Sequence, residues 1–498
     1  QCIQCNRCAY VCPHAVIRPV ALTEEEVAQA PEGLKTLDMI GMPGMKFTMT
    51  VSAYDCTGCG SCVNVCPGKK NKETGEVEKA LTMANMEANA GEQTFFDFGR
   101  EIPVKPEVVA KFKETTVKGS QFKQPLLEFS GACAGCGETP YAKLITQLFG
   151  DRMYIANATG CSSIWGNSSP STPYTVTPEG KGPAWSNSLF EDNAEFGYGM
   201  LLAQNTIRDR LKAKVEKIAE KTTDEAVKAA AAEYLETYTV GATNGTATDK
   251  LVAALEALDC DCEERAEVLK NKDFLAKKSQ WIFGGDGWAY DIGYGGVDHV
   301  LASKKDINIM VFDTEVYSNT GGQSSKATKT GATAQFAAGG KETKKKDLAG
   351  MAMTYGYVYV AQIAMGADFN QTVKAIAEAE AYPGPSLIIA YAPCINHGIK
   401  KGMSKAQTEE QLAVECGYWN NFRYNPAAEG DKFSLDSKAP KAEGYQDFLN
   451  GEVRYNALKR ANPAKADKLF ALNEQEAMER YDYLNKLVTV YAAEKEDK

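Results

Sequence analysis

The sequence reads Trp281-Ile282-Phe283-Gly284-Gly285-Asp286-Gly287 near the middle of its 498 residues. The apolar residues suit a buried strand, and the glycines beside Asp286 suit a turn in which the backbone approaches a ligand closely. A helical, Gly-rich segment follows from Ala289 to Ala302, and a second apolar strand follows from Ile307 to Phe312. Strand, helix and strand in this order predict a parallel α/β sheet, whose ligands lie at the carboxyl ends of the strands.

The same alternation extends to both sides of this unit. Further strands are expected at Met153–Ala156, Tyr357–Gln362 and Leu387–Tyr391, and further helices at Gln371–Ala381 and from about Pro463. From about Gly197 to Lys278 the chain is rich in Ala, Glu and Lys with an amphipathic period, which is interrupted near Gly241 to Gly245. This segment predicts surface helices inserted on the sheet. We therefore expect an α/β domain over residues 125–498 with a helical insertion over about 197–278.

The second strand ends in a polar segment, which runs Asp313-Thr314-Glu315-Val316-Tyr317-Ser318-Asn319-Thr320-Gly321-Gly322-Gln323. It follows its strand as Gly285-Asp286-Gly287 follows the first, so both segments fall at the same edge of the predicted sheet. Glycines let backbone N–H groups contact a diphosphate, and Asp286 offers a carboxylate to Mg²⁺, which takes about six oxygen ligands. The two segments predict a diphosphate and magnesium site.

Fifteen cysteines is a high number for this chain, and eight of them form two copies of one pattern. The copies are Cys2, Cys5, Cys8 and Cys12-Pro13, and Cys56, Cys59, Cys62 and Cys66-Pro67. Both follow C-x2-C-x2-C-x3-C-P, the run of bacterial two-cluster ferredoxins, whose fourth Cys ligates the other cluster. One copy has a chance of roughly one in a million at these residue frequencies. We assign one [4Fe–4S] cluster to Cys2, Cys5, Cys8 and Cys66, and the other to Cys56, Cys59, Cys62 and Cys12. Two zinc knuckles are the alternative.

A third group of cysteines is less regular. It comprises Cys133-Ala134-Gly135-Cys136, Cys161 in Gly160-Cys161-Ser162, and Cys394 after the strand that ends at Tyr391. A C-x2-C alone is compatible with zinc, a redox disulfide or a cluster. With two clusters upstream, a third cluster is the economical interpretation. We expect Cys260, Cys262 and Cys416 to be ordinary free thiols.

The composition and the first residues of the sequence limit the classes of protein that remain possible. The formal net charge of −10 argues against nucleic-acid binding, which normally needs a basic face. No apolar run approaches the ~18–20 residues of a membrane span, and no signal peptide opens the sequence. The first cysteine run begins at Cys2, although a ligand loop needs support on both sides, so we interpret the chain as the C-terminal piece of a longer protein. Residues 1–105 are expected to form the two-cluster domain, and residues 106–124 a linker.

This constellation resembles the pyruvate:ferredoxin (flavodoxin) oxidoreductase family over essentially the whole chain. The specific marks are the two cysteine runs, Cys133 to Tyr141, Gly160-Cys161-Ser162, Gly285-Asp286-Gly287 and Tyr317 to Gln323. The Gly-Asp-Gly element is similar to the thiamine diphosphate motif, although Asp313-Thr314 stands where that motif has Asn-Asn. The resemblance implies an α+β, ferredoxin-like domain with two [4Fe–4S] clusters, followed by a parallel-sheet α/β domain that binds thiamine diphosphate and Mg²⁺.

The resemblance also implies roles for single residues. The third cluster would be held by Cys133, Cys136, Cys161 and Cys394, and Mg²⁺ by Asp286, Thr314 and the carbonyl of Val316. Glu138 and Cys161 would lie against the thiamine. The diphosphate site would be lined by Gly285, Asp286, Gly287, Trp288, Thr314, Glu315, Val316, Tyr317, Ser318 and Asn319. Asn319 would also reach the substrate as a catalytic residue, whereas His397 is expected to be structural.

The implied reaction is the oxidative decarboxylation of pyruvate with coenzyme A to acetyl-CoA and CO₂. Electrons would pass through three [4Fe–4S] clusters to ferredoxin or flavodoxin. Upstream domains of the same enzyme would supply the carboxylate that activates the thiamine, together with the coenzyme A contacts. This chain is therefore not expected to complete the reaction alone. The family resemblance further implies a cytoplasmic, oxygen-sensitive homodimer of anaerobic metabolism, without nucleic-acid or membrane partners.

Two other functions remain open at this point. An enzyme of the same class could use another 2-oxoacid, such as 2-oxoglutarate or a branched-chain or aryl oxoacid, and a panel of oxoacids would distinguish it. A non-enzymatic electron-transfer module would use the α/β part only as a scaffold and would contain no thiamine diphosphate. A secreted disulfide protein is a more remote alternative.

Overall fold

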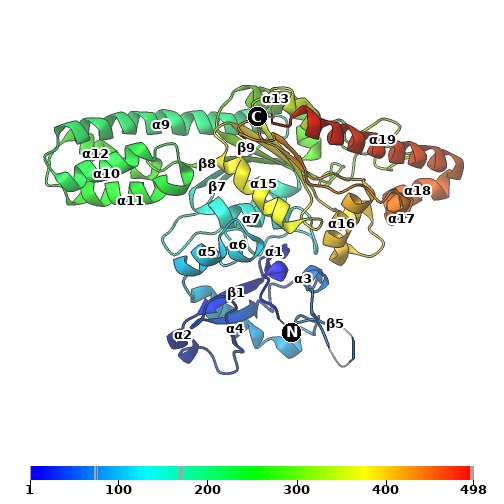
Figure 1. Ribbon diagram of the computed structural model, residues 1–498, viewed down its shortest axis with the longest axis horizontal. Coiled ribbons are helices and arrows are strands. Elements are labelled where there is room, and N and C mark those ends of the chain that lie inside the picture. The colour runs from blue at the N-terminus through cyan, green and yellow to red at the C-terminus, as the bar shows by residue number, and fades with distance from the viewer. Residues whose placement is uncertain (1, 72–73, 76, 168–171, 494–498) are drawn as a thin grey trace, which may run out of the picture.

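An eight-stranded sheet lies at the centre of the computed structural model, which describes residues 2–71, 74–75, 77–167 and 172–493 (Figure 1). Its strand order is β13-β12-β10-β11-β9-β8-β6-β7. The strands from β10 to β7 run parallel, and β12 and β13 add an antiparallel edge beside β10. The predicted parallel α/β sheet is confirmed.

The strands of this sheet are β6 (Met153–Ala158), β7 (Ala184–Ser188), β8 (Ser279–Gly285), β9 (Ile307–Asp313), β10 (Tyr359–Ile363), β11 (Pro385–Tyr391), β12 (Phe422–Tyr424) and β13 (Phe433–Leu435). The five predicted strands all occur, as β6, β8, β9, β10 and β11. The sequence pattern misses β7, which is polar and partly exposed, and the three-residue strands β12 and β13. Polar or very short strands lack the apolar run by which the buried ones are recognised.

Both faces of the sheet are covered by helices. Alternate residues of β9 enter different cores, with Ile309 and Val311 on one face and Met310 and Phe312 on the other. The first face carries α13 (Tyr294–Ala302), α14 (Leu348–Met353), α16 (Ala406–Cys416), α17 (Tyr445–Asn450), α18 (Val453–Ala461) and α19 (Pro463–Val490). The second face carries α7 (Thr139–Phe149), α8 (Cys161–Asn167) and α15 (Phe369–Ala381).

The predicted helical insertion forms a lobe beside the sheet (Figure 1). It contains α9 (Asn193–Lys221), α10 (Glu225–Glu236), α11 (Gly241–Ala257) and α12 (Glu263–Lys270). The lobe has a core of its own, which includes Leu211, Tyr234 and Leu251. The helical character is confirmed. The interruption predicted near Gly241 to Gly245 lies directly before it, between Thr237 and Val240, and Gly241 begins α11.

Two of the expected free thiols are joined. Cys260 and Cys262, in the turn between α11 and α12, form a disulfide whose Cα atoms lie 5.5 Å apart. That separation suits a disulfide, and the turn holds the two residues at this distance. The expectation of free thiols at Cys260 and Cys262 is therefore wrong, whereas Cys416 is a buried free thiol.

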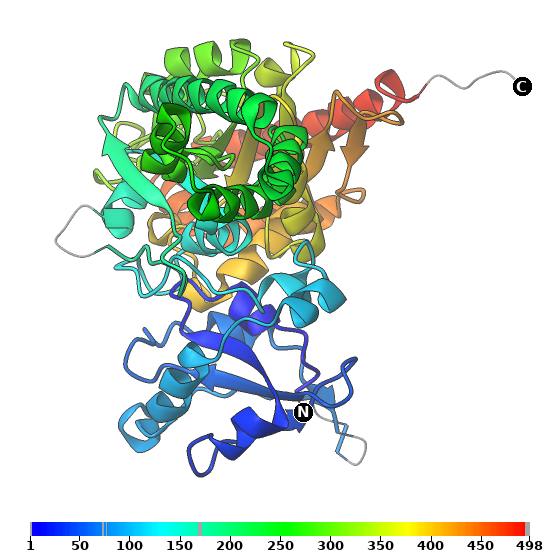
Figure 2. The ribbon, with the colours of Figure 1, turned by 90° about the vertical axis from the view of Figure 1, so that its left-hand side faces the viewer.

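The N-terminal part lies below the central sheet (Figure 2). Its elements are α1 (Arg7–Tyr10), β1 (Ile17–Leu22), α2 (Glu24–Ala28), β2 (Leu37–Asp38), β3 (Lys46–Val51), α3 (Ser61–Val65), β4 (Lys69–Lys70), β5 (Val77–Glu78) and α4 (Glu92–Glu101). The strands β1, β3 and β2 form an antiparallel sheet. The short helices α1 and α3 carry the third cysteine of each run, Cys8 and Cys62, and pack together.

Specific contacts join this part to the α/β domain. The hydroxyl of Tyr10 donates to the carbonyl of Phe369 over 3.0 Å, and the amide of Asn64 donates to the carbonyl of Ser404 over 2.7 Å. Within the segment expected to be a linker, residues 106–124, the chain forms α5 (Pro106–Phe112) and α6 (Val117–Ser120). Val108 and Phe122 of that segment pack on the apolar core of the N-terminal part. The domain boundaries themselves stay predictions.

Across the described ranges, none of the helices combines the length and the apolar character that crossing a membrane requires.

Candidate functional site

The ends of β8 and β9 meet at Asp286, as the motif predicts. The Asp286 side chain is fully buried, and its Oδ1 accepts hydrogen bonds from the backbone N–H of Thr314 at 3.2 Å and from Thr314 Oγ1 at 3.0 Å. Thr314 Oγ1 also lies 3.0 Å from the carbonyl oxygen of Val316. The three predicted magnesium ligands therefore lie together.

The donor set of this cluster fits Mg²⁺. A carboxylate, a hydroxyl and a carbonyl are hard oxygen ligands of the kind that this ion prefers. Burial, together with the neighbouring charge of Asp313, raises the pKa of Asp286 to about 8. A buried carboxylate beside a second carboxylate is unfavourable in its charged form, and a bound cation would stabilise that form. The residues present therefore suit Mg²⁺.

Two glycines of this segment are required by close packing. A Cβ added to Gly284 would lie 2.3 Å from Trp288 Cε3, and one added to Gly287 would lie 2.7 Å from the ring of Tyr317. A Cβ added to Gly285 would have its nearest neighbour at 3.9 Å. Gly284 and Gly287 therefore allow tight packing of the protein on itself, whereas Gly285 leaves open space in front of the strand end.

The helix that follows is wound as a π-helix over Gly287–Ile292. Such single-turn π-helices are rare and are frequent at functional sites. Here the π turn follows directly after Asp286 and contains Trp288, which is fully buried. The indole Nε1 of Trp288 has no hydrogen-bond partner among the described residues.

A network of buried charges lies behind residues 313–319, the segment at the end of β9 that we call the magnesium loop. Lys345 Nζ contacts Asp313 Oδ2 at 2.7 Å and Glu315 Oε1 at 3.1 Å, and Arg454 contacts Glu315 Oε2 at 3.0 Å. Burial alone would raise the pKa of Glu315, but Lys345, Arg454 and Lys329 outweigh burial and hold that pKa well below its usual range. Burial raises the pKa of Asp313 even though Lys345 opposes the shift.

The third group of cysteines gathers near Glu138. Burial raises the pKa of the thiols of Cys136, Cys161 and Cys394, and the neighbouring Glu138 carboxylate raises each of them further. Cys394 also interacts with Cys136 and Cys161, and Cys133 contributes to the raised pKa of Cys394. The structure thus brings together the four cysteines that were predicted as one set.

Glu138 lies at the start of α7 within this group. It is buried, and its Oε2 accepts a hydrogen bond from Trp165 Nε1 over 2.8 Å. Burial raises the pKa of Glu138 to about 7, and the bond from Trp165 opposes that shift.

Three side chains connect the cysteine group with the magnesium loop. Ser318 Oγ donates to Cys161 Sγ over 3.1 Å, and Asn396 Nδ2 donates to the carbonyl of Ser318 over 3.1 Å. His397 Nδ1 accepts from the backbone N–H of Cys394 at 3.4 Å, so Nε2 carries the proton and donates to the carbonyl of Thr314 at 2.6 Å. Burial lowers the pKa of His397 to about 3, so the ring is neutral. His397 anchors the loop at Thr314, and its structural role stays a prediction.

The two regular cysteine runs also approach each other. Burial raises the pKa of Cys62 to about 12, with further contributions from Cys12, Cys59 and Cys56. The pKa of Cys8 is raised by burial and by Cys62, Cys5 and Cys2. Cys12, the fourth cysteine of the first run, therefore lies near Cys56 and Cys62 of the second run, which agrees with the crossed assignment of Cys12.

Within the described part of the chain, no three His, Cys, Asp or Glu side chains are grouped as the ligands of a single metal ion would be. A cubane cluster differs from a single ion, because its four cysteines bind four separate irons and their sulfurs lie further apart. The four cysteines of a cluster therefore need not form the tight group that a single ion requires.

The remaining predicted residues lie on the same loop with different exposure. Tyr317 and Ser318 are partly buried, with the ring of Tyr317 against Phe190, and Asn319 is exposed. Sequence reasoning missed Ser325, whose Oγ donates to Asp286 Oδ2 over 2.5 Å, and Lys345. It likewise missed Trp165 and Asn396, because nothing in their local sequence marks a residue that acts through a distant partner.

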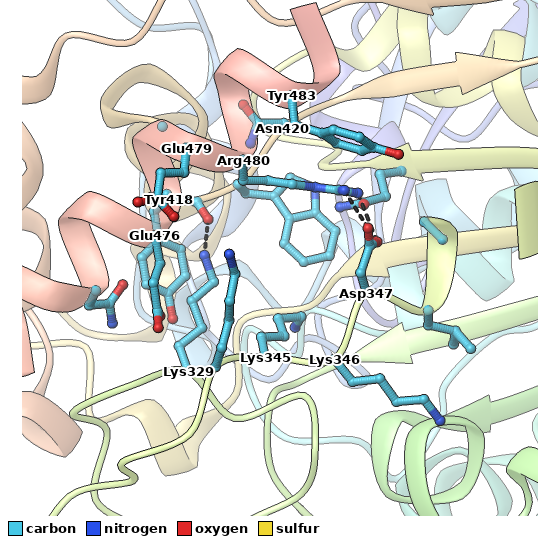
Figure 3. A pocket seen from close by; sticks show the side chains of 18 of the residues that line it. Lys329, Lys345, Lys346, Asp347, Tyr418, Asn420, Glu476, Glu479, Arg480 and Tyr483 are labelled. Atoms are coloured by element: carbon cyan, nitrogen blue, oxygen red, sulfur yellow. Dashed lines mark hydrogen bonds and ion pairs between the residues drawn. The ribbon is translucent and has the colours of Figure 1, made fainter. Parts of the chain in front are cut away.

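A cavity of about 350 Å³ lies beside the charged network (Figure 3). It is lined by α19, by the loop that contains Lys345 and Asp347, and by the segment from Gly417 to Asn420. Tyr290 and Lys345 line this cavity and also contact Asp313. None of the predicted diphosphate or magnesium residues is among its lining residues, so the cavity is separate from that site.

Two parts of the chain match models of known families. Residues 1–70 match the 4Fe-4S dicluster domain, and residues 268–390 match the C-terminal TPP binding domain of thiamine pyrophosphate enzymes. The first match covers both regular cysteine runs, and the second covers Asp286 and the loop after β9. The matches agree with the positions of the cysteine runs and of the Gly-Asp-Gly element.

Similar proteins cover nearly the whole chain. It is 56% identical over 497 residues to the pyruvate:ferredoxin oxidoreductase of Moorella thermoacetica, across 98% of this chain and 41% of that protein. It is 53% identical over 498 residues to the pyruvate-flavodoxin oxidoreductase of Enterobacter agglomerans and 52% identical over 489 residues to that of Klebsiella pneumoniae, with the same coverage. The chain spans about two fifths of the length of these relatives.

Proposed function

The chain belongs to the pyruvate:ferredoxin (flavodoxin) oxidoreductase family, as a homologue of its C-terminal part, and we propose that it is the electron-delivering portion of such an enzyme. The complete enzyme would oxidise pyruvate with coenzyme A to acetyl-CoA and CO₂ and pass the electrons to ferredoxin or flavodoxin. The names of the relatives support pyruvate over other 2-oxoacids. Upstream domains would complete the site, and a homodimer in the cytoplasm is the assembly we propose.

One observation carries this proposal. The hydroxyl of Ser318, on the loop that contains the magnesium ligands, donates to Cys161 Sγ in the third cysteine group. One loop would therefore contact both a cofactor bound at Asp286 and an iron–sulfur cluster bound at Cys161. Such proximity is what a transfer of single electrons from an organic cofactor to a metal cluster requires.

The residues would hold three [4Fe–4S] clusters, thiamine diphosphate and Mg²⁺. Asp286, Thr314 and the carbonyl of Val316 would bind Mg²⁺, and the open space before Gly285 would admit the diphosphate. When bound, thiamine diphosphate supplies the electron sink that decarboxylation of a 2-oxoacid needs. Cys133, Cys136, Cys161 and Cys394 would bind the cluster nearest to it.

The chain's own side chains would shape this site. Trp165 orients the carboxyl group of Glu138, and the Ser318 hydroxyl contacts Cys161 Sγ between the proposed cofactor and the proposed cluster. Asn319 is exposed on the loop and would meet the substrate where the upstream domains close over it. The two-cluster domain would then carry electrons outward, because it forms the end of the molecule below the central sheet (Figure 2).

Anaerobic purification of the whole enzyme tests the proposal. Iron, sulfide and thiamine diphosphate are counted per chain, and the enzyme is assayed with pyruvate, 2-oxoglutarate, and branched-chain and aryl oxoacids. We expect three clusters and one thiamine diphosphate, with pyruvate preferred. Asp286→Ala should lose thiamine diphosphate but keep its clusters. Wild-type enzyme with clusters but no thiamine diphosphate would support the electron-transfer module instead.

A further inference from the structure

Two buried carboxylates flank the magnesium residue Thr314. The side chains of Asp313 and Glu315 are both fully buried, and one ammonium group, Nζ of Lys345, contacts both of them, at 2.7 and 3.1 Å. A buried carboxylate without a partner is strongly unfavourable. The thiamine diphosphate motif has an uncharged asparagine where this chain has Asp313, so the extra charge needs a compensating group here.

The backbone beside Thr314 is held by the same contacts. Glu315 adopts a left-handed conformation with φ of 59°, which residues other than glycine rarely adopt. Its carboxylate is bound by Lys345 and Arg454 and accepts a hydrogen bond from Tyr418, and its carbonyl accepts one from Thr328 over 2.5 Å. Asp313 Oδ1 accepts the backbone N–H of Glu315 at 3.1 Å. These contacts stabilise an unusual turn. On its two sides, Thr314 Oγ1 contacts Asp286, and the Val316 carbonyl contacts Thr314 Oγ1.

Other groups near Asp313 and Glu315 serve only one of them. The Tyr290 hydroxyl donates to Asp313 over 2.8 Å but carries no charge. Of the two carboxylates, Arg454 contacts only that of Glu315. Among the described residues, Lys345 is the cation that contacts the carboxylates on both sides of Thr314. It lies with Tyr290 on the wall of the cavity beside α19 (Figure 3).

We propose that Lys345 is a positioning residue for the magnesium loop. Its ammonium neutralises Asp313 and ties Asp313 to Glu315, so that Thr314 Oγ1 and the Val316 carbonyl stay beside Asp286. Lys345 itself contacts neither the metal nor the cofactor in this inference. The inference rests on the proposed function, because it assigns Lys345 to the same magnesium and diphosphate site.

The test uses the complete enzyme, purified anaerobically and freed of thiamine diphosphate and Mg²⁺. Binding of thiamine diphosphate is titrated at several Mg²⁺ concentrations, so that the dependence on Mg²⁺ is measured apart from turnover. Lys345→Met should weaken Mg²⁺-dependent binding by about 10- to 100-fold, the usual effect of losing a residue that supports a metal ligand. The added change Asp313→Asn should restore affinity to within about threefold of wild type, because it removes the charge that Lys345 balances.

Lys344→Met is the matched control. Lys344 is the preceding residue, lines the same cavity and is exposed, so its replacement should leave binding unchanged. Iron content and the circular dichroism spectrum are recorded for every variant. A general loss of structure would move these values, whereas a positioning role moves the Mg²⁺ dependence and is rescued by Asp313→Asn.

Wild-type affinity in Lys345→Met would overturn the inference, as would a folded double variant without recovery. If Lys345→Met alone does not fold, Asp313→Asn is compared with the double variant. Equal affinity of these two supports the inference, and a loss of about tenfold or more on removing the lysine contradicts it. Failure of the proposed function is recognised separately, because the wild-type enzyme itself would then bind no thiamine diphosphate.

Discussion

The Oγ of Ser318 donates a hydrogen bond to the Sγ of Cys161 over 3.1 Å. This bond joins a loop of the thiamine pyrophosphate-binding domain to a cysteine of the third group. The carbonyl of Ser318 in turn accepts a bond from Asn396, two residues after Cys394. Ser318 thus touches the surroundings of two cysteines that lie far apart in the sequence.

Replacing Ser318 by Ala should make the potential of the nearest cluster more negative. A hydrogen bond to a cluster sulfur favours the reduced state, which carries more negative charge. A net bond energy of about 0.5–1.5 kcal/mol corresponds to a shift of roughly 20–60 mV for one electron. Redox titration followed by electron paramagnetic resonance measures it. Thr320→Ala, on the same loop, is the control, and an equal shift in both variants would contradict the assignment.

Double variants of the cysteine runs should reveal the crossed ligation. Cys12 lies near Cys56 and Cys62 and is assigned with them and Cys59 to one cluster, so Cys12→Ala combined with Cys59→Ala should remove one cluster. Cys12→Ala combined with Cys5→Ala should remove two, because Cys5 belongs to the other set. Iron and sulfide counts distinguish the two pairs of variants. The reverse result would show that each run holds its own cluster.

Gly284→Ala should destabilise the α/β domain. The added methyl group would meet Trp288 at 2.3 Å and Ala158 at 3.0 Å, in a core that has no space to yield. Overpacking of this kind costs about 1–3 kcal/mol. Thermal unfolding of the whole enzyme measures the change.

Gly285→Ala is the matched variant for this test. The nearest atom to its added methyl group lies at 3.9 Å, so stability should stay near that of wild type, while thiamine diphosphate binding weakens. Equal destabilisation by both changes would argue against the packing role assigned to Gly284.

The buried carboxyl of Glu410 should make stability depend on pH. Its Oε2 accepts from the backbone N–H of Gly366 at 2.7 Å and from the Tyr141 hydroxyl at 3.1 Å, yet burial outweighs these bonds and raises its pKa to about 8. The folded protein then binds a proton that the unfolded chain releases near pH 4.5. Its contribution to stability is therefore fully present below pH 4.5 and is lost as the pH rises through about 8.

Glu410→Gln should flatten this dependence, which we expect to be on the order of a few kcal/mol. The free energy of unfolding of wild type and Glu410→Gln is measured with denaturant at about pH 5, 7 and 9. The exposed Glu443, replaced by Gln, is the control and should leave the curve unchanged. An equal pH dependence in wild type and Glu410→Gln would show that Glu410 does not bind the extra proton in the folded protein.

Local sequence patterns were sufficient to predict which cofactors the chain suits. The spacing of Cys2 to Cys12 and of Cys56 to Cys66 identified the two-cluster domain, and apolar runs before Gly285 and Asp313 identified the strands that carry the diphosphate site. These features are short in sequence, and their physical constraints act between neighbouring residues. The polar strand β7 and the three-residue strands β12 and β13 were not predicted, because they lack the apolar run of the buried strands.

What the sequence by itself determined is therefore the kind of ligand that each segment suits: thiolates for iron, and a carboxylate with glycines for a metal diphosphate. The tertiary structure alone decided which of these groups meet: Ser318 with Cys161, His397 with Thr314, and Lys345 with Asp313 and Glu315. Each of these pairs joins separate segments, and its distance depends on how strands and helices pack. No local pattern records that packing, because it is set by the whole core at once.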